Sequence, residues 1–455
     1  MRKTKRRIGN ARGTIQRAEP HWREHTADDE GKDLSRLIAV ALVTFLLTLS
    51  AAPTRSSEAV TADDTARFLA GLPVPSNSPL APITSDPVWL SHARNLNSAF
   101  SGEESAQFSK IREFSEKYLT EKHDTVLYMF SGPDFLYATS FFPNASTYVL
   151  AGLEPVGSVP DLTSLSRWAV DRELRSLEAS MSSLFSFSFF ITHKMKTQLR
   201  EGQIYGALPI LYVFLARTSK TIHEVNFVHL DEQGNVQIAG ELDAVARVSQ
   251  TNKTVPSSGV KIVFSDGNGP RQTLYYFSTN LADGSFQRSG FSAFLAKLGP
   301  ADSLIKSASY LLHGAHFAAV RTLLLNRSAT IVQDDSGIPL TYFEATKWRV
   351  QAFGHYAGPI PMFANFYQPR MAELFRSANP LEFGIGYRWR KNESNLLLAQ
   401  NGSQLSNEEV TAQPTPDANA PVVAAPSAKK ARKRVEGGGM RPSGCRIATV
   451  FPFCW

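Results

Sequence analysis

The stretch VLYMFSGPDFLYATSFFPNASTYVLAGLEP, residues Val126–Pro155, contains two apolar runs separated by a short segment with helical character. The first run ends in Ser131–Asp134, where Gly permits a tight turn, Pro suits the start of a helix and Asp is favoured in a first helical turn. The second run leads to Glu154. A strand, a helix and a returning strand in this order predict two neighbouring parallel strands.

Asp134 and Glu154 are the candidate catalytic residues. Parallel neighbours end at the same edge of a sheet, so both carboxylates would flank the crevice in which open α/β sheets bind ligands. Paired carboxylates bind a hard cation or divide acid and base roles. The alternative is structural, with Asp134 serving the helix start and Glu154 exposed to water. The stretch contains neither GxGxxG nor a P-loop, and we expect no cofactor and no dedicated metal site.

The remainder of the body alternates between helical and hairpin patterns. Turn residues between β-branched and aromatic runs predict hairpins over His223–Ile238 and Val260–Ser278. Apolar spacing predicts helices over Phe291–Leu298 and Ala301–Leu325. Parallel-type units followed by hairpins predict an α/β fold, with a mixed sheet and helices on its faces.

Composition divides the chain into five segments. We expect a basic leader at 1–36, a signal peptide or membrane anchor at 37–59, a linker rich in Ser, Pro, Ala and Thr at 60–84, a globular body at 85–400 and a disordered basic tail at 401–455. The patterns leave open whether the body is one domain or two.

The export prediction depends on the apolar run Leu37–Leu49, which follows Arg36 and a basic N-terminus. The uncharged span 37–52 would reach about 24 Å as a helix, short of the ~30 Å hydrocarbon core of a bilayer. A cleaved signal peptide is therefore favoured, and an uncleaved anchor is the alternative. Either version predicts an exported protein, membrane-anchored through 37–52 or released to the periplasm or outside the cell.

Charge and cysteine content restrict the partners. The net charge of +7 comes from the ends, because 1–36 carries 10 basic and 6 acidic residues and 410–455 carries 7 and 2. The body between them has 31 basic and 33 acidic residues, which argues against a nucleic-acid partner. Cys445 and Cys454 both lie in the tail, so the body has neither a disulfide nor a thiolate metal site.

Three further patterns have a structural and a functional interpretation. His313 and His316 could share a helix face as metal ligands, but are more typical of a helix end or a core. Asp334–Gly337 resembles a hairpin turn more than a cation-binding loop. The aromatic region 342–389 is typical of a core, and its alternative is a surface that stacks on sugars.

The sequence therefore leaves three classes of function open. The first is an exported or membrane-anchored envelope protein that binds or scaffolds a protein or glycan partner. The second is a cation-dependent hydrolase that uses Asp134 and Glu154, and the third is a carbohydrate-binding module that uses region 342–389. The sequence does not decide whether the protein is an enzyme.

Overall fold

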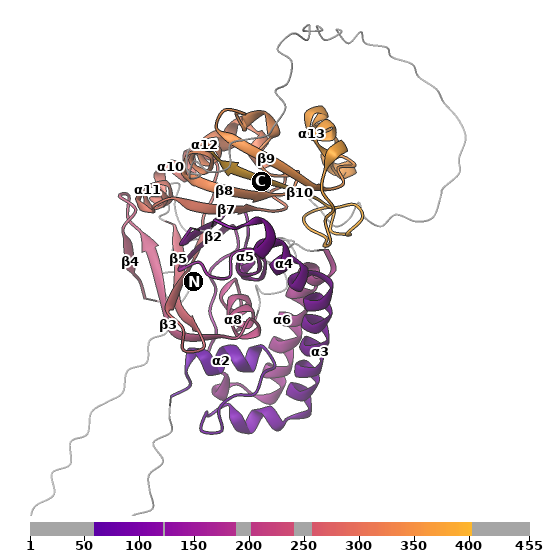
Figure 1. Ribbon diagram of the computed structural model, residues 1–455. Coiled ribbons are helices and arrows are strands. Elements are labelled where there is room, and N and C mark those ends of the chain that lie inside the picture. The colour runs from indigo at the N-terminus through magenta and orange to yellow at the C-terminus, as the bar shows by residue number, and fades with distance from the viewer. Residues whose placement is uncertain (1–58, 122, 188–201, 241–256, 403–455) are drawn as a thin grey trace, which may run out of the picture. The chain divides into compact units, whose positions relative to one another are not determined.

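The computed structural model describes residues 59–121, 123–187, 202–240 and 257–402 (Figure 1). Within these ranges ten strands form one sheet, in the order β4-β3-β5-β6-β2-β1-β7-β8-β10-β9. The sheet mixes parallel and antiparallel pairs and carries helices, so the predicted α/β class is confirmed. The predicted leader, export segment and tail lie outside the described residues, apart from a few residues at their inner ends.

The centre of the sheet is parallel. Its five strands are, in spatial order, β6 (Arg271–Ser278), β2 (Thr147–Gly152), β1 (Thr125–Tyr128), β7 (Ala301–Ile305) and β8 (Ser328–Gln333). The chain runs outward from β1 to β2 and β6, then returns to the other side of β1 to form β7 and β8. The order of the strands therefore reverses between β1 and β7.

Antiparallel strands extend both sides of this centre. Beyond β6 lie β5 (Ser258–Asp266), β3 (Lys220–Leu230) and β4 (Val236–Ile238). Beyond β8 lie β10 (Asn395–Asn401) and β9 (Trp348–Gly354). Both predicted hairpins are confirmed, since β3 pairs with β4 and β5 with β6.

Two layers of helices cover the two faces of the sheet, as Figure 1 shows. Alternate side chains of β1 enter separate cores, with Val126 and Tyr128 on one side and Leu127, followed by Met129 just after the strand, on the other. The first core contains α2 (Ala62–Leu69), α3 (Pro87–Glu103), α4 (Ser109–Tyr118), α5 (Phe135–Phe141), α6 (Arg167–Phe187) and α8 (Leu208–Arg217). The second contains α10 (Asp283–Arg288), α11 (Phe291–Lys297) and α12 (Ala318–Arg327).

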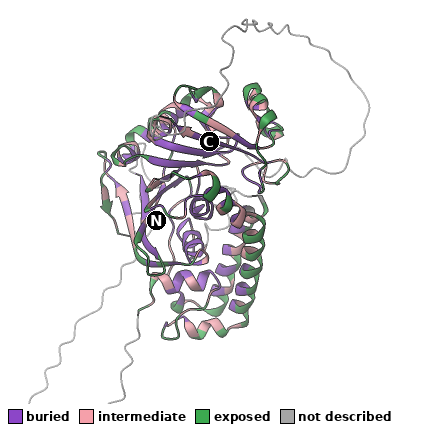
Figure 2. Ribbon diagram, viewed as in Figure 1, coloured by how far each residue is buried: buried purple, intermediate pink, exposed green. Residues whose placement is uncertain are grey.

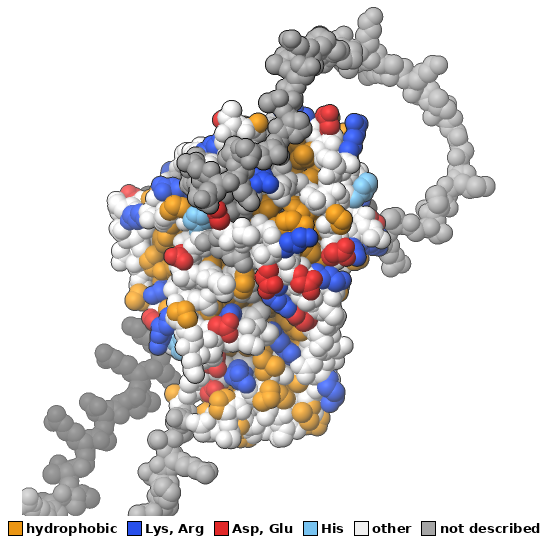
Figure 3. All heavy atoms as spheres, viewed as in Figure 1, with side chains coloured by type: hydrophobic (Ala, Val, Ile, Leu, Met, Phe, Trp, Pro, Cys, Tyr) orange, Lys and Arg blue, Asp and Glu red, His pale blue; other side chains and the backbone are white. Residues whose placement is uncertain are grey.

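The central strands are buried on both faces, as the purple strands in Figure 2 show. A smaller cluster joins α13 (Pro369–Leu374) to β9 and β10. On the face drawn in Figure 3, basic and acidic side chains are interspersed, in keeping with the nearly balanced charge of the body. None of the helices in the described ranges combines the length and the apolar character that crossing a bilayer requires.

The folded body begins before the predicted boundary at residue 85. Within the segment expected to be a linker, 60–84, lies α2, whose Thr61 cap accepts a hydrogen bond from Asp64 N at 3.0 Å. Phe68 and Leu69 are fully buried in the first core. Their burial makes α2 part of the body, because two large apolar side chains favour packing over a solvated linker.

The predicted helix over Ala301–Leu325 is wrong in its first half. The residues from Ala301 to Ile305 form β7, short 3-10 helices follow at Leu311–His313 and Ala315–Phe317, and α-helix begins only with α12. All five residues of β7 are buried, because β1 and β8 pair with it on either side and helices cover both faces. A strand buried in this way loses the alternation that distinguishes it from a helix in sequence.

Candidate ligand site at the carboxyl edge of the sheet

The quoted stretch forms a β–α–β unit that presents Asp134 at the end of β1. β1 and β2 are parallel, and α5 connects them. Asp134 caps α5 by accepting a hydrogen bond from Tyr137 N at 3.4 Å. The whole residue is only 1 % exposed, so the structure places this carboxylate inside the protein rather than on an open rim.

Asp134 forms a buried ion pair with Lys306, which follows β7. Lys306 Nζ lies 2.8 Å from Asp134 Oδ2, and Tyr128 Oη donates to the same oxygen at 2.9 Å. The ammonium also lies 3.4 Å from the centre of the Tyr137 ring, a cation–π contact. Burial lowers the pKa of Lys306 and the charge of Asp134 opposes that change. The segments that follow β1 and β7, on the two sides of the strand-order reversal, are thus joined by a buried ion pair.

Glu154 lies two residues beyond β2 and is 3 % exposed. Its carboxylate packs over two glycines: a Cβ on Gly152 would lie 2.4 Å, and one on Gly132 3.2 Å, from Glu154 Oε2. Tyr276 Oη donates to the Glu154 carbonyl oxygen at 2.8 Å and faces Oε2 at 3.4 Å. The two glycines therefore make the space that this carboxylate occupies at the ends of β1 and β2.

A second acidic pair, Asp334 and Asp335, follows β8 at the same edge. Asp334 accepts from Ser307 N at 2.9 Å and Ser336 N at 3.0 Å. Tyr310 Oη donates to Asp335 at 2.6 Å. Burial, followed by the neighbouring charge of Asp335, raises the pKa of Asp334 to about 7. Burial and the adjacent like charge thus both favour the protonated form of Asp334.

Asp334–Gly337 does form the predicted turn, with Gly337 N donating to Asp334 O at 3.2 Å, but this turn does not close a hairpin. β8 pairs with β7 and β10, and the chain after Gly337 continues into the short 3-10 helix Leu340–Tyr342 instead of returning beside β8. A turn sequence after an apolar strand has the same residue types whether the chain reverses or leaves the sheet edge. The hydrogen bond that Ser307 N, in the loop after β7, donates to Asp334 decides whether the chain reverses or leaves the edge. It joins residues that are distant in sequence.

Strained backbone concentrates at this edge. Five residues other than glycine have positive φ in the described part of the chain, and four of them follow β1 or β7: Phe130 (63°), Ser307 (53°), Ser309 (51°) and Tyr310 (55°). Such conformations persist where the surroundings enforce them, and they cluster at functional sites. Two buried polar atoms here, Ser307 Oγ and Asn395 Nδ2, have no hydrogen-bond partner within the part of the chain that the structure describes. Both observations point to a site rather than to simple packing.

Two segments cover the edge. After α3, a π-helical turn at Glu104–Phe108 places Gln107 Oε1 2.9 Å from Gly384 N, in the loop before β10. In that loop Gly386 lies against Asp334, where a Cβ would be 1.8 Å from Oδ2. Arg388 donates to Gly358 O at 3.1 Å and so links two parts of the β9–β10 connection. Gly386 thereby places the loop before β10 against the Asp334 carboxylate, and the four acidic residues are each at most 3 % exposed.

The alternative of a histidine pair on one helix face is not realised, and His313 lies at a helix end, as the favoured interpretation expects. His313 ends the 3-10 helix Leu311–His313, while His316 belongs to the next, Ala315–Phe317. In the described ranges, no three His, Cys, Asp or Glu side chains form a group suited to a metal ion. His313 instead packs against Tyr310, with ring centres 5.2 Å apart, and so belongs to the edge through an aromatic contact.

The aromatic region 342–389 is divided between core and surface. Phe343, Trp348, Phe353, Tyr356, Phe375 and Phe383 are each at most 8 % exposed. Tyr342 and Tyr367 are 42 % and 52 % exposed, but the first packs on Arg321 and the second on Tyr356. These two rings are the part of the region that offers exposed surface to a sugar.

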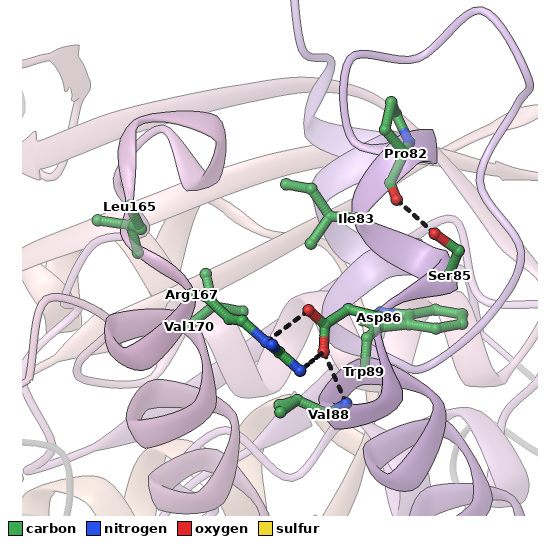
Figure 4. Close-up of a pocket in the computed structure, with 9 residues that line it drawn as sticks. All are labelled: Pro82, Ile83, Ser85, Asp86, Val88, Trp89, Leu165, Arg167 and Val170. Atoms are coloured by element: carbon green, nitrogen blue, oxygen red, sulfur yellow. Dashed lines mark hydrogen bonds and ion pairs between the residues drawn. The ribbon is translucent and has the colours of Figure 1, made fainter.

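A separate pocket of about 330 Å³ lies between the start of α3 and the start of α6 (Figure 4). Its walls include Ile83, Trp89 and Val170, with the Asp86–Arg167 ion pair on one side. Asp86 also caps α3, accepting from Val88 N at 2.8 Å. Because both its carboxylate oxygens are engaged, the pocket presents little free polar chemistry, and the sheet edge is the stronger candidate site.

Comparison with known proteins gives no further assignment: no family model, no curated protein and no solved structure matches the chain. The site is therefore described by its own chemistry. Sequence reasoning found Asp134 and Glu154 from their positions after apolar runs. It missed Lys306, which lay inside a predicted helix, and it assigned Asp334 and Asp335 to a turn.

Proposed function

We propose that this protein binds a small ligand of the nucleoside class at the carboxyl edge of β1, β2, β7 and β8. The strand-order reversal between β1 and β7 carries the proposal, because open α/β sheets bind ligands at such a point. Glu154 supports the choice of ligand. An acidic residue after the second strand, about 20 residues beyond the glycine of the first turn, is the group that binds ribose hydroxyls in dinucleotide-binding sheets.

The charge of the edge favours a ligand without phosphate. The buried ammonium of Lys306 lies near Asp134 and Asp334, and the Arg388 guanidinium lies near Asp335. Glu154 is a fourth buried carboxylate at this edge. The first turn has one glycine and an acidic cap, in contrast to the glycine-rich, donor-lined turns that hold phosphates. A neutral or cationic nucleoside suits this surface because it brings donors rather than further negative charge.

The cation-dependent hydrolase is a weaker proposal on this geometry. Lys306 Nζ, 2.8 Å from Asp134, holds the position beside the carboxylate that a bound cation would need. Asp134 also accepts hydrogen bonds from Tyr128 Oη and Tyr137 N. With Lys306, three donors therefore already occupy its carboxylate oxygens. The carbohydrate-binding proposal is left with Tyr342 and Tyr367, which come from different segments.

The ligand proposal predicts that Glu154→Gln weakens nucleoside binding by roughly 10- to 100-fold, the effect of losing a hydrogen bond to a charged group. Isothermal titration with adenosine, S-adenosylmethionine and ATP measures it, and we expect ATP to bind most weakly. Glu232→Gln, at an exposed turn, is the matched control and should bind as the unmodified protein does. Failure of all three compounds to bind, or equal binding by both variants, contradicts the proposal.

We also propose that the protein is exported through segment 37–59, as the apolar run after Arg36 indicates. It would then act in the cell envelope or outside the cell, where it could scaffold a partner. A reporter enzyme fused after residue 60 should reach the periplasm, the membrane fraction or the medium. A reporter that is found only in the cytosol, free of membrane, rules the proposed location out.

A further inference from the structure

The carboxyl edge carries an aromatic group whose members are held in two different ways. Tyr310 and Tyr387 lie nearly parallel, with ring centres 6.4 Å apart and planes inclined by 8°. Phe366 lies on Tyr310 in almost the same orientation, 5.1 Å away at 9°. Phe363 contacts both tyrosines at an inclined angle, with ring centres 5.0 and 5.4 Å away.

The two tyrosines are fixed by polar anchors on the strand ends. Tyr310 Oη donates to Asp335 at 2.6 Å, and Tyr387 Oη donates to Ser307 O at 3.0 Å. A further hydrogen bond of 2.8 Å joins the Tyr387 and Ser309 hydroxyls. Ser307, Ser309 and Tyr310 are the strained residues after β7, so the protein maintains an unfavourable backbone to hold these rings in place.

The rings of Phe363 and Phe366 make apolar contacts, whereas the ends of their segment are tied by hydrogen bonds from Arg388 to Pro359 O at 3.1 Å and from Gln368 N to Tyr356 Oη at 3.0 Å. Both phenylalanines belong to the 3-10 segment Pro361–Phe366, which is kinked at Phe363 and exposes its other four residues. Its backbone N–H groups at Phe363 and Tyr367 donate to Ile360 O and Ala364 O, inside the same segment. Gly358, with φ of 86°, precedes the segment and supplies a position where the chain direction can change.

We propose, on the basis of the proposed function, that Tyr310 and Tyr387 form the stacking surface for the nucleobase of the ligand. Phe363 and Phe366 occupy this place in the free protein. A nucleobase satisfies the same geometry because stacking requires only a planar ring, and it adds hydrogen-bonding groups that phenylalanine lacks. The ribose would then extend toward Glu154.

His313 supplies a polar group suited to the edge of a base. Its ring contacts Tyr310 and Phe366 with centres 5.2 Å from each, and its buried Nε2 atom has no hydrogen-bond partner among the described residues. Burial, with a smaller contribution from the Arg321 charge, lowers the pKa of His313 to about 4. The imidazole is neutral at pH 7 and would make one directional hydrogen bond to the base once Phe366 has moved.

Adenosine titration of three variants tests the stacking surface. F363A/F366A removes the covering rings, so adenosine affinity should increase on the order of tenfold. Y387L keeps an apolar side chain but removes the stacking ring, so affinity should fall by a factor on the order of ten, as for other base-stacking aromatics. The control Tyr367→Ala removes an exposed ring of the same connection and should leave affinity unchanged.

The outcomes separate this inference from the ligand proposal. Adenosine binding that depends on Glu154 but is indifferent to Tyr387 and to the two phenylalanines overturns the stacking surface alone. Absence of adenosine binding in every variant overturns both proposals. Where F363A/F366A loses its cooperative thermal transition, Phe366→Ala provides the same test, with a smaller increase in affinity expected and unchanged affinity counting against the inference.

Discussion

Replacing Lys306 by Met is expected to lower the free energy of unfolding by about 3–5 kcal/mol, the cost of removing one partner from a buried ion pair. Lys306 and Asp134 are 1 % and 2 % exposed at their side chains, so the remaining carboxylate would have no access to water. Met preserves most of the volume and removes the charge. Urea unfolding of the full chain, followed by circular dichroism, measures the change.

Two further variants show whether the loss is due to charge. K306M/D134N removes the uncompensated carboxylate while keeping an acceptor for Tyr128, so it should be more stable than Lys306→Met alone. Lys261→Met changes a partly buried lysine of β5 and should alter stability by less than about 1 kcal/mol. Equal losses for Lys306→Met and Lys261→Met would mean that the ion pair contributes nothing to the fold.

Replacing Gly157 by Ala is expected to destabilise the protein by about 3 kcal/mol, from the cost of a left-handed residue combined with overpacking. Gly157 has φ of 76°, and a Cβ there would lie 1.7 Å from Tyr205 O. Gly206 faces it with φ of 81°, and the neighbours Ser158 and Tyr205 exchange hydrogen bonds of 3.1 and 3.2 Å. The clash is with backbone, which has no alternative rotamer.

The close contact between the backbones at Gly157 and Gly206 also positions the site, because it fixes the loop that carries Glu154 against the start of α8. Ala207 N donates to Pro155 O at 3.0 Å, one residue beyond Glu154. Gly102→Ala is the matched control: it lies in α3 with no atom within 4 Å of the added Cβ, so stability should be unchanged or slightly higher. A thermal midpoint for Gly157→Ala equal to that of Gly102→Ala would refute the close approach.

Local patterns predicted several elements well. The apolar stripe of α6, which comprises Val170, Leu174, Leu177, Met181 and Leu184, is buried throughout. Asp161 caps the 3-10 turn Leu162–Ser164, and α6 begins at Arg167. Asp134 does cap α5 as its position after Gly132-Pro133 indicates. These features depend on neighbours within a few residues, which the sequence displays directly.

The amino-acid sequence by itself determined the α/β class, the parallel β1–β2 unit, both hairpins and the placement of Asp134 and Glu154 at strand ends. Only the tertiary structure decided that Lys306 meets Asp134, that Asp334 and Asp335 join the same edge, and that Phe363 and Phe366 cover Tyr310. Helix capping, hydrophobic periodicity and turn chemistry depend on residues a few positions apart, so they can be recognised in the sequence. The burial and pairing of these charges and rings depend on strands brought together from separate parts of the chain, and no local pattern encodes that.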